Sequence, residues 1–390
     1  MEPETARTVS LEGVMEMSPI GIFQYRLMLM CGLTLMSDGL EVPLLSFVSP
    51  CAAAEWGLST TDQATLAGIV FLGIFIGSMF WGWFADHYGR RPAYLYSAMI
   101  IVVGGFATAA SPSYEFLILF RGITGFGIGG ASVPFDLLAE FLPISHRGSF
   151  LSFSMIFWTF GSLFVAGVAW VSLATLGWRF LAFTTAIPVC IVTILSYFYL
   201  PESPRWLLSK EREREANIVV RQAALVNGVI LPEFSIKNEF SKTAKEGSYA
   251  DLMQTKEARR ITLPLWAIWG LFGITYYGLL LFVSRIYSNE SSAGSTETKQ
   301  CEFNYPPIFY SAVSEVGGVM LCVFLVDKLG RVNSQTLFYT VGGIAVMTMG
   351  FKFSPGVVLF LSIISRLAAM SSSVSLYITV LCLFMEYRLP

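Results

Sequence analysis

The stretch GWFADHYGRR at residues 82–91 decides the fold, because it places charged side chains in a short turn between two long apolar runs. Residues 64–84 and 92–110, on either side of it, are each about as long as a membrane-spanning helix, which needs about 20 apolar residues. A weaker copy of the turn, DKLGR at 327–331, again follows an apolar run. Two such turns, each behind a membrane helix, predict a duplicated transporter.

The composition is that of a membrane protein. Of the 390 residues, 54% are hydrophobic and only 13% are charged, whereas soluble domains carry about 25% charged residues. The net charge of -2 is small and argues against nucleic acid as a partner. The expected partners are therefore the lipid bilayer and a small solute. The first 26 residues lack the charged start and apolar run of a cleavable signal peptide.

Long apolar runs predict an all-α protein that crosses the membrane many times, since a helix satisfies its own backbone in lipid. They divide the chain into a cytoplasmic tail at 1–26, a six-helix bundle at 27–200, a cytoplasmic linker with short amphipathic helices at 201–261, and a partial bundle of about four helices at 262–390. The sequence predicts ten spans, at 27–48, 64–84, 92–110, 116–138, 150–173, 178–200, 262–283, 306–326, 334–353 and 355–384.

Basic residues set the expected orientation, because cytoplasmic loops are enriched in Lys and Arg. Arg90, Arg91, Arg147, Lys328 and Arg331 follow the second, fourth and eighth spans. These loops and the N-terminus are therefore expected on the cytoplasmic side. The membrane would be the plasma membrane or that of an intracellular vesicle.

The loops expected outside carry two features of extracellular or lumenal surfaces. Asn289 begins an N-x-S sequence in the loop after the seventh span, where it could be glycosylated. Cys51 and Cys301 lie one in each half of the chain and could form a disulfide in an oxidising compartment. The six cysteines do not have the spacing of a metal site, and we expect neither a metal nor a cofactor.

Several charged residues fall inside the predicted spans, where burying a charge costs about 3 kcal/mol. Such residues usually face a cavity or an opposite charge, so each could bind solute or form a structural ion pair. Three aromatic residues at mid-membrane depth could either pack or hold an organic cation against their rings. The candidate solute-binding residues are Asp38, Glu41, Trp158, Tyr276, Tyr277, Glu315 and Arg366.

The run GFGIGG at 125–130 matches the dinucleotide-binding pattern G-x-G-x-x-G, but it follows no predicted strand. It lies within a predicted span, where small residues let neighbouring helices approach closely. We therefore interpret the run as a packing surface between membrane helices and not as a nucleotide site.

Four motifs resemble those of the major facilitator superfamily. They are Gly82-x-x-x-Asp86-x-x-Gly89-Arg90-Arg91, Arg121-Gly122-x-x-Gly125-x-Gly127, Ala139-Glu140-Phe141-Leu142-Pro143 with Arg147-Gly148, and Pro201-Glu202-Ser203-Pro204-Arg205-Trp206-Leu207. The last motif is typical of the sugar-porter and organic-ion branches. The resemblance implies two six-helix bundles around a central solute site that opens alternately to each side of the membrane.

The resemblance also implies a cytoplasmic latch, which is a set of residues whose charges exchange partners as the bundles rock. Exposed ion pairs contribute about 0–1 kcal/mol each, which suits a latch that must open often. The latch residues in this sequence would be Gly82, Asp86, Gly89, Arg90, Arg91, Arg121, Glu140, Arg147, Glu202 and Arg205, with Asp327 and Arg331 from the second half.

Further stretches resemble the synaptic-vesicle-2-related transporters, which are relatives of organic cation carriers. These stretches are 38–41, 51–56, 276–278, and Glu315 ahead of 327–331. Two features depart from the family pattern. The chain stops where the family has two more helices, so the second bundle is expected to be incomplete. The seventh span lacks the paired Gln of sugar porters around 270–277, which favours a charged organic solute over a sugar.

Three functions are consistent with the sequence. The first is a secondary transporter of a small organic ion, with H+ or Na+ as the candidate coupling ion. The second is a proton-coupled carrier of a sugar or polyol. The third is a non-transporting vesicle or regulatory membrane protein built on a transporter fold. An enzyme is not expected, because the sequence contains neither G-x-S-x-G nor H-E-x-x-H.

Overall fold

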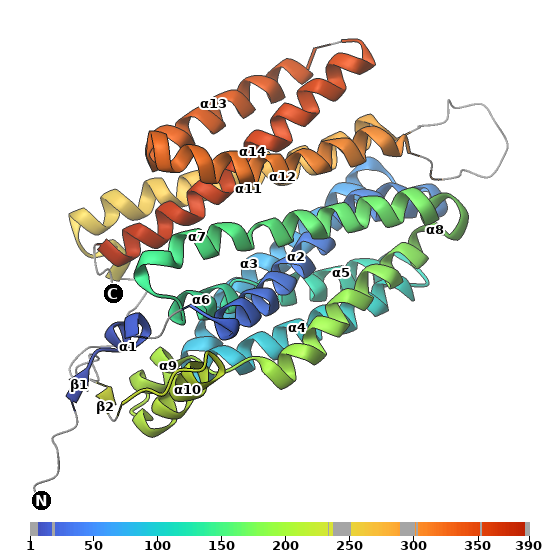
Figure 1. The fold of residues 1–390 in the computed structure, drawn as a ribbon. Helices are drawn as coiled ribbons and strands as arrows, with labels where there is room; N and C mark the ends of the chain where they lie inside the picture. Colours follow the sequence, from blue (N-terminus) through green and yellow to red (C-terminus); the bar gives the residue numbers. More distant parts are fainter. Residues whose placement is uncertain are drawn as a thin grey trace, which may run out of the picture. The chain divides into compact units, whose positions relative to one another are not determined.

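A computed structural model describes residues 7–17, 20–232, 234–236, 251–288, 301, 303–351 and 353–386. The expected glycosylation residue, Asn289, lies outside them, and the side chain of Asp327 is not described. The described chain is almost wholly helical (Figure 1). The helices are α1 Leu11–Met17, α2 Ile22–Trp56, α3 Thr60–Tyr88, α4 Arg90–Ala109, α5 Tyr114–Ile128, α6 Val133–Glu140, α7 Ile144–Ser154, α8 Ile156–Tyr199, α9 Pro204–Ser209, α10 Glu213–Val226, a 3-10 turn Asp251–Met253, α11 Lys256–Ile286, α12 Tyr305–Leu329, α13 Arg331–Met349 and α14 Pro355–Glu386.

A two-stranded parallel sheet joins the N-terminal segment to the linker. Strand β1, Arg7–Val9, pairs with β2, Phe234–Ile236, so that Arg7 lies opposite Phe234. The sequence did not predict this sheet, because a three-residue strand carries too little alternation to recognise. Helices α9 and α10 pack together in the linker (Figure 1) and contain the amphipathic stretches expected between 201 and 261.

Eight stretches of the described helices are long and apolar enough to cross a membrane, compared with the ten spans expected. Two expected spans are joined in the stretch Ile144–Tyr199, because the helix is counted as continuous through a kink at Gly177, where φ is 78°. The span expected at 334–353 corresponds to α13, whose polar first turns lower its hydropathy. Helix α2 continues through Pro43, although a proline there removes one helix hydrogen bond.

The chain packs as two compact units. Unit 1 consists of Met1–Asp38, Ser59–Ser154 and Ala182–Ala244. Unit 2 consists of Gly39–Leu58, Met155–Leu181 and Lys245–Pro390. Helices α2 and α8 are each divided between the units. These units are therefore not the bundles expected at 27–200 and 262–390, and that division stays a prediction.

Glycines bring α3 and α5 into direct contact within unit 1. A Cβ added to Gly77 would lie 2.1 Å from the carbonyl oxygen of Phe126. One added to Gly125 would lie 2.3 Å from the carbonyl oxygen of Val70. The indole Nε1 of Trp81 also donates to the Phe126 carbonyl, at 2.9 Å. The glycine-rich run of α5 is therefore a packing surface, where small residues let two membrane helices approach closely.

Gly77→Ala is expected to lower the stability of unit 1 by about 1–3 kcal/mol, the usual cost of overpacking. The added methyl group would meet backbone, which cannot rotate away as a side chain can. Gly68→Ala on the same helix is the control, because its added Cβ would meet open space. Thermal unfolding of the purified protein in detergent compares the two variants, and equal midpoints would contradict the tight contact between α3 and α5.

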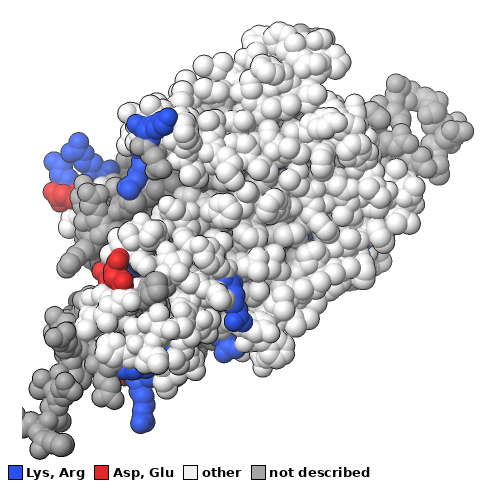
Figure 2. Space-filling view, in the orientation of Figure 1, with Lys and Arg blue, Asp and Glu red and all other residues white. Residues whose placement is uncertain are grey.

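Large apolar side chains cover the outward side of α3. Leu72, Phe75, Ile76 and Met79 are all exposed. On the face shown in Figure 2, broad areas carry neither Lys or Arg nor Asp or Glu. A soluble monomer rarely exposes an apolar surface of this extent, so the exposure fits helices that are surrounded by lipid.

Candidate functional site

Two opposite charges lie buried together inside unit 2. Glu315 lies in α12 and Arg366 in α14, and these two helices pack side by side (Figure 1). Their side chains are only 0% and 4% exposed, respectively. The guanidinium of Arg366 contacts Glu315 Oε1 through Nη2 at 2.8 Å and through Nε at 3.0 Å. An ion pair in apolar helices carries a large desolvation penalty, which points to a role beyond stability.

Two serines that the sequence did not mark as candidates complete the contacts of this arginine. Arg366 donates from Nη1 to Ser311 Oγ and from Nη2 to Ser162 Oγ, both at 3.2 Å. Ser311 precedes Glu315 by four residues, so both lie on one face of α12. That spacing of a serine and a carboxylate in an apolar span is the signal that could have found Ser311.

A chain of aromatic donors reaches the same carboxylate. Trp158 Nε1 donates to the Tyr276 hydroxyl at 2.7 Å, and this hydroxyl donates to Glu315 Oε1 at 3.3 Å. Phe272 stacks on the ring of Tyr276, with the ring centroids 5.5 Å apart. Three donor atoms therefore converge on Glu315 Oε1. The other oxygen, Oε2, is buried and accepts no hydrogen bond from the described residues.

Four of the expected solute-binding residues meet in this cluster, namely Trp158, Tyr276, Glu315 and Arg366. Tyr277 lies beside them, with its ring centroid 5.6 Å from that of Tyr276. Glu41 is buried in the part of α2 that belongs to unit 2. Asp38 lies three residues earlier in the same helix but belongs to unit 1.

A close helix contact fixes the position of Trp158. A Cβ added to Gly39 of α2 would lie 2.3 Å from the Trp158 carbonyl oxygen, within unit 2. Because glycine carries no side chain, the backbone of α8 can lie directly against α2. The indole is thereby held where it can donate to Tyr276. The sequence did not predict this contact of Gly39.

In unit 1, the carboxylate of Glu202 caps the helix that follows the charged turn. Its Oε1 accepts from the backbone N–H groups of Arg90 at 2.9 Å, Arg91 at 3.2 Å and Ser203 at 2.8 Å. The first two are donors left unpaired at the start of α4, where a negative charge is favoured. Burial raises the pKa of the Glu202 carboxyl, while the backbone donors oppose that rise. Gly89, with φ 111°, permits the turn.

Other expected latch residues contact the same turn. Asp86 pairs with Arg90 at 3.4 Å, and its carbonyl accepts from Trp206 Nε1 at 2.9 Å. Ser203 donates from its hydroxyl to Glu140 and accepts from the backbone N–H of Trp206 at 2.9 Å. Helix α9 is therefore tied both to the end of α3 and to the end of α6.

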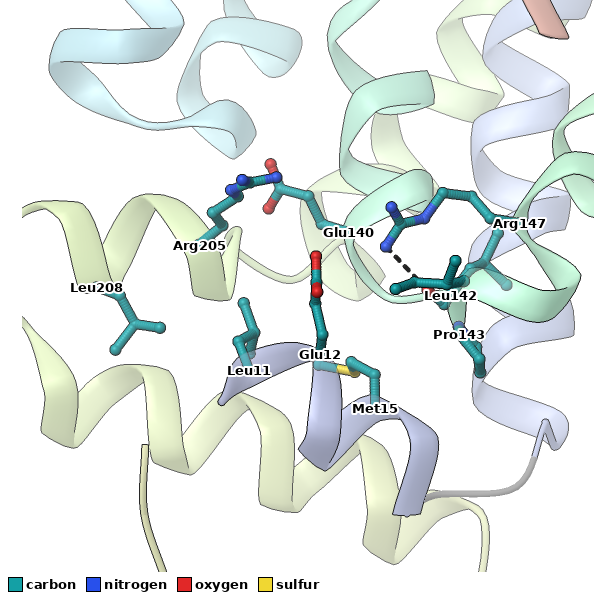
Figure 3. Close-up of a pocket in the computed structure, with 10 residues that line it drawn as sticks. Leu11, Glu12, Met15, Glu140, Leu142, Pro143, Arg147, Arg205 and Leu208 are labelled. Atoms are coloured by element: carbon teal, nitrogen blue, oxygen red, sulfur yellow. Dashed lines mark hydrogen bonds between the residues drawn. The ribbon is translucent and has the colours of Figure 1, made fainter. Parts of the chain in front are cut away.

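A small pocket in unit 1 collects three of the expected latch residues, Glu140, Arg147 and Arg205 (Figure 3). The Glu140 and Arg205 side chains face each other, and Arg147 Nη2 donates to the Leu142 carbonyl at 3.2 Å. Glu12 of α1 reaches into the same pocket, a placement that the sequence did not predict. Acidic and basic groups from α1, α6, α7 and α9 thus share one site.

The remaining expected latch residues lie elsewhere. Arg121 is buried in α5, and Gly82 lies within α3. In unit 2, Arg331 begins α13 and is exposed, directly after Gly330 with φ 77°. Gly89 and Arg90 have the same arrangement in unit 1. The two weakly similar sequences therefore build one local geometry, in which a glycine with positive φ precedes a helix that begins with arginine.

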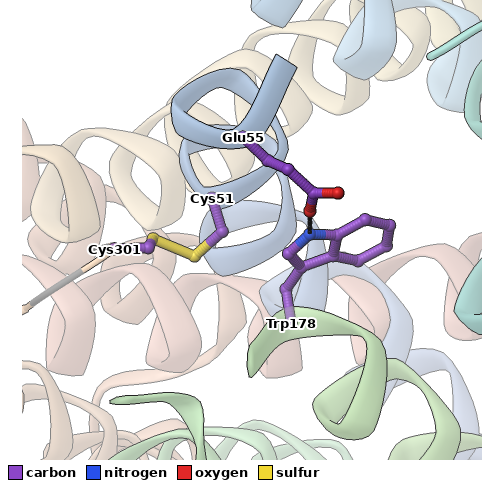
Figure 4. Close-up of a disulfide and its surroundings, with 4 residues drawn as sticks. All are labelled: Cys51, Glu55, Trp178 and Cys301. Carbon is purple, nitrogen blue, oxygen red and sulfur yellow. Dashed lines mark hydrogen bonds between the residues drawn. A yellow bond between two sulfur atoms is a disulfide. The ribbon is translucent and has the colours of Figure 1, made fainter. Parts of the chain in front are cut away.

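Unit 2 carries a disulfide between Cys51 and Cys301, whose Cα atoms lie 5.1 Å apart (Figure 4). Beside it, Glu55 accepts from Trp178 Nε1 at 2.8 Å and forms an ion pair with Arg179 at 2.7 Å. The sequence proposed the cysteine pair but not the contacts of Glu55, because those partners are 123 and 124 residues away along the chain.

The sequence profile of the sugar (and other) transporter family matches residues 19–386 of this chain. The chain belongs to this family. Its members are transporters and not enzymes, as the sequence predicted. The expected relationship to this branch of the major facilitator superfamily is likewise confirmed.

Curated relatives agree with the family assignment. A Caenorhabditis elegans protein named svop-1 is 31% identical over 375 residues, which cover 92% of the present chain and 72% of svop-1. The synaptic vesicle 2-related protein of Pongo abelii is 30% identical, over 86% of this chain and 63% of that protein. Organic cation/carnitine transporter 7 of Arabidopsis thaliana is 28% identical, over 81% and 70%. The chain thus spans 63–72% of the length of these relatives.

Solved structures of transporters share the fold of this family member. The partially occluded, inward-open xylose transporter XylE from E. coli matches with a TM-score of 0.69, over 92% of this chain and 87% of XylE. The two sequences are 20% identical, so the similarity concerns the fold alone. The multi-pass helical fold expected from the sequence is confirmed.

Proposed function

We propose that this chain is a secondary active transporter of a small organic ion, which it binds at the Glu315–Arg366 pair and moves by alternating access. The buried pair carries the proposal. It places one acidic and one basic group, both almost fully removed from solvent, next to the rings of Trp158 and Tyr276. Such a cluster offers a charged solute both charge recognition and an apolar surface.

An organic cation can engage this cluster through several groups. Its ammonium group can donate to Glu315 Oε2, which no described residue uses, and so weaken the hold of Arg366 on the carboxylate. The rings of Trp158 and Tyr276 can add about 0.5–2 kcal/mol each through cation–π attraction. A carboxylate on the same solute would meet the guanidinium of Arg366. The name of the Arabidopsis relative, organic cation/carnitine transporter 7, supports a charged organic solute.

Replacement of a partner in the pair can drive the change between conformations. Two buried charges stay compatible with an apolar interior only while each has a partner. A solute cation or a proton on Glu315 changes that balance and can favour a different conformation, provided it binds the two conformations unequally. We propose H+ or Na+ as the coupling ion on this basis.

The expected latch would lie on the cytoplasmic side of the membrane, where the N-terminus would also lie. In this proposal the ion pairs and hydrogen bonds of the latch exchange partners as the bundles rock. The disulfide at Cys51 and the N-x-S sequence at Asn289 would be on the opposite, outer side of the membrane. The contacts of Glu140, Glu202 and Asp86 within unit 1 support the proposal, because they are hydrogen bonds and an ion pair that can be exchanged one at a time. The host membrane would be the plasma membrane or that of a vesicle.

A proton-coupled carrier of a sugar or polyol is the second candidate. The description of the family, sugar (and other) transporters, favours it. The sequence of α11 contains no Gln, which weighs against this candidate. The sugar porters that this chain resembles carry a paired Gln in the corresponding helix. A non-transporting membrane protein with the same fold is the third candidate.

Uptake into proteoliposomes tests these candidates against each other. The purified full chain is reconstituted and given labelled organic cations, organic anions and sugars, with and without a proton or sodium gradient. Gradient-dependent uptake of an organic ion is the expected result. Uptake of sugar alone would favour the second candidate, and no uptake of any solute by correctly inserted protein would favour the third.

Glu315→Gln is expected to lower uptake of the organic ion at least about tenfold at sub-saturating concentration, because a hydrogen bond to a charged group contributes about 1.5–3 kcal/mol. Glu213→Gln is the matched control, since Glu213 is an exposed carboxylate on the linker helix α10. Initial rates are normalised to the amount of inserted protein. Equal initial uptake rates for the two variants would show that Glu315 does not bind the solute.

A further inference from the structure

A groove in unit 1 lies between the start of α2, the end of α8 and helix α10. Its volume is about 470 Å³. Residues between Phe23 and Met30 line it from α2, and residues between Leu195 and Pro201 line it from the end of α8 and the chain that follows. Helix α2 begins at Ile22 and α8 ends at Tyr199, so the groove lies at the end of two membrane spans. This is the depth at which phospholipid headgroups meet the apolar chains.

The charges that line the groove are all positive. Arg26 and Arg91 line it together with the neutral amide of Gln222, and no carboxylate among the described residues lines it. Arg26 is exposed, and its guanidinium lies 5.4 Å from the centre of the Tyr199 ring. Among the described residues, no carboxylate lies within ion-pair distance of Arg26. The groove is therefore electrostatically complementary to an anion.

Arg91 reaches the groove from the start of α4. Its Nη2 donates to the Tyr197 carbonyl at 2.7 Å, which directs the guanidinium toward the end of α8. Its Nε is buried and has no acceptor among the described residues. Arg91 therefore brings a positive charge to the lining of the groove, although Glu202 also lies close enough to attract the same guanidinium.

The rest of the groove is apolar and open to the surroundings. Leu29, Phe198 and Tyr199 are exposed on the two spanning helices. Along α2, the wall from Phe23 to Met30 extends about 10 Å, at about 1.5 Å per residue. A hydrated inorganic anion would gain nothing from this surface, whereas the first carbons of an acyl chain would be removed from water along it.

We propose that this groove binds an anionic phospholipid of the bilayer. The phosphate lies between Arg26 and Arg91, since guanidinium groups match the geometry of phosphate oxygens. An acyl chain follows Leu29 and Met30 toward the membrane interior. The lipid is distinct from the transported solute, because the groove lies in unit 1 and the Glu315 cluster lies in unit 2.

Native mass spectrometry of the full chain tests the proposal, using mixed micelles with equal amounts of phosphatidylglycerol and phosphatidylcholine. The wild-type protein is expected to retain phosphatidylglycerol in preference to phosphatidylcholine. Arg26→Gln is expected to reduce that preference about fivefold, the contribution of one basic residue near an anionic surface. Arg26→Lys keeps the charge and is expected to retain most of the preference.

Arg212→Gln is the matched control, because Arg212 is exposed and already pairs with Glu215 at 2.6 Å. It is expected to leave the lipid preference unchanged. Equal retention of the two lipids by the wild-type protein, or an equal loss in Arg212→Gln and Arg26→Gln, would overturn the proposal. Displacement of the lipid by inorganic phosphate at concentrations comparable to those of the lipid would also overturn it, and would identify a site for free anions instead.

Discussion

Arg366→Gln is expected to destabilise the protein by about 3–5 kcal/mol, because it leaves a buried carboxylate without its opposite charge. Glu315 is 0% exposed, so water cannot replace the lost guanidinium without opening the packed helices. The measured quantity is the free energy of unfolding in detergent micelles, obtained from a denaturant titration. The loss should appear as a lower midpoint with an unchanged slope.

The double variant Glu315→Gln/Arg366→Gln is expected to recover most of that stability. Both side chains are then neutral amides that can share hydrogen bonds, and replacing a buried ion pair by neutral groups is often close to neutral in free energy. The four proteins of this double-mutant cycle give the interaction free energy of the pair. Arg366→Gln should therefore be less stable than the double variant, although it carries fewer changes.

Arg179→Gln provides the control for burial. It breaks the ion pair with Glu55, in which each side chain is 39% exposed. Exposed pairs contribute about 0–1 kcal/mol, so the expected loss is small. The two arginines make similar contacts with a carboxylate and differ mainly in exposure. A loss for Arg366→Gln that is no larger than the loss for Arg179→Gln would show that water reaches the Glu315 cluster.

Cys51→Ser is expected to lower the free energy of unfolding by about 5 kcal/mol in the chain-entropy model, in which the stabilisation grows with the length of the closed loop. The disulfide joins residues that are 250 apart in the sequence, so its loss frees a long segment of the unfolded chain. Cys301→Ser should cause the same loss, and the double variant no more, because the two sulfurs form one bond.

Thermal unfolding with and without a reductant measures this effect. The reductant should lower the midpoint of the wild-type protein to that of Cys51→Ser and leave the variant unchanged. Cys190→Ser is the control, because Cys190 is a free cysteine in α8. Equal midpoints for Cys51→Ser and Cys190→Ser under oxidising conditions would contradict a stabilising role for the disulfide.

Membrane helices could be predicted from the sequence because each depends on a local property, the length of an apolar run. The expected spans at 64–84, 92–110 and 306–326 lie within or within one residue of α3, α4 and α12. Interruptions inside a run were harder to predict. The span expected at 116–138 is broken into α5 and α6, because the chain leaves the α-helix within its glycine-rich run, after Ile128. Conversely, Pro43 leaves α2 unbroken.

The charges of the candidate site were found for the same local reason, since a charge in an apolar run stands out. Their pairing was not predictable, because it depends on which helices pack together. Arg366 meets Glu315 51 residues away and Ser162 204 residues away. The rule that selected Glu315 also selected Asp38, which the packing places in the other unit. Ser162 is uncharged and small, so nothing in the sequence distinguished it from other serines in the spans.

The unshared oxygen of Glu315 has a chemical consequence for a solute bound beside it. A primary or secondary ammonium carries N–H groups that can satisfy Oε2, whereas a fully methylated nitrogen carries none. Sites built to hydrogen-bond one substrate group reject an analogue that lacks it by about 10⁴-fold. On this geometry the protein would favour amines that keep a hydrogen over their quaternary counterparts, and its preferred solute would therefore differ from carnitine, whose nitrogen is fully methylated.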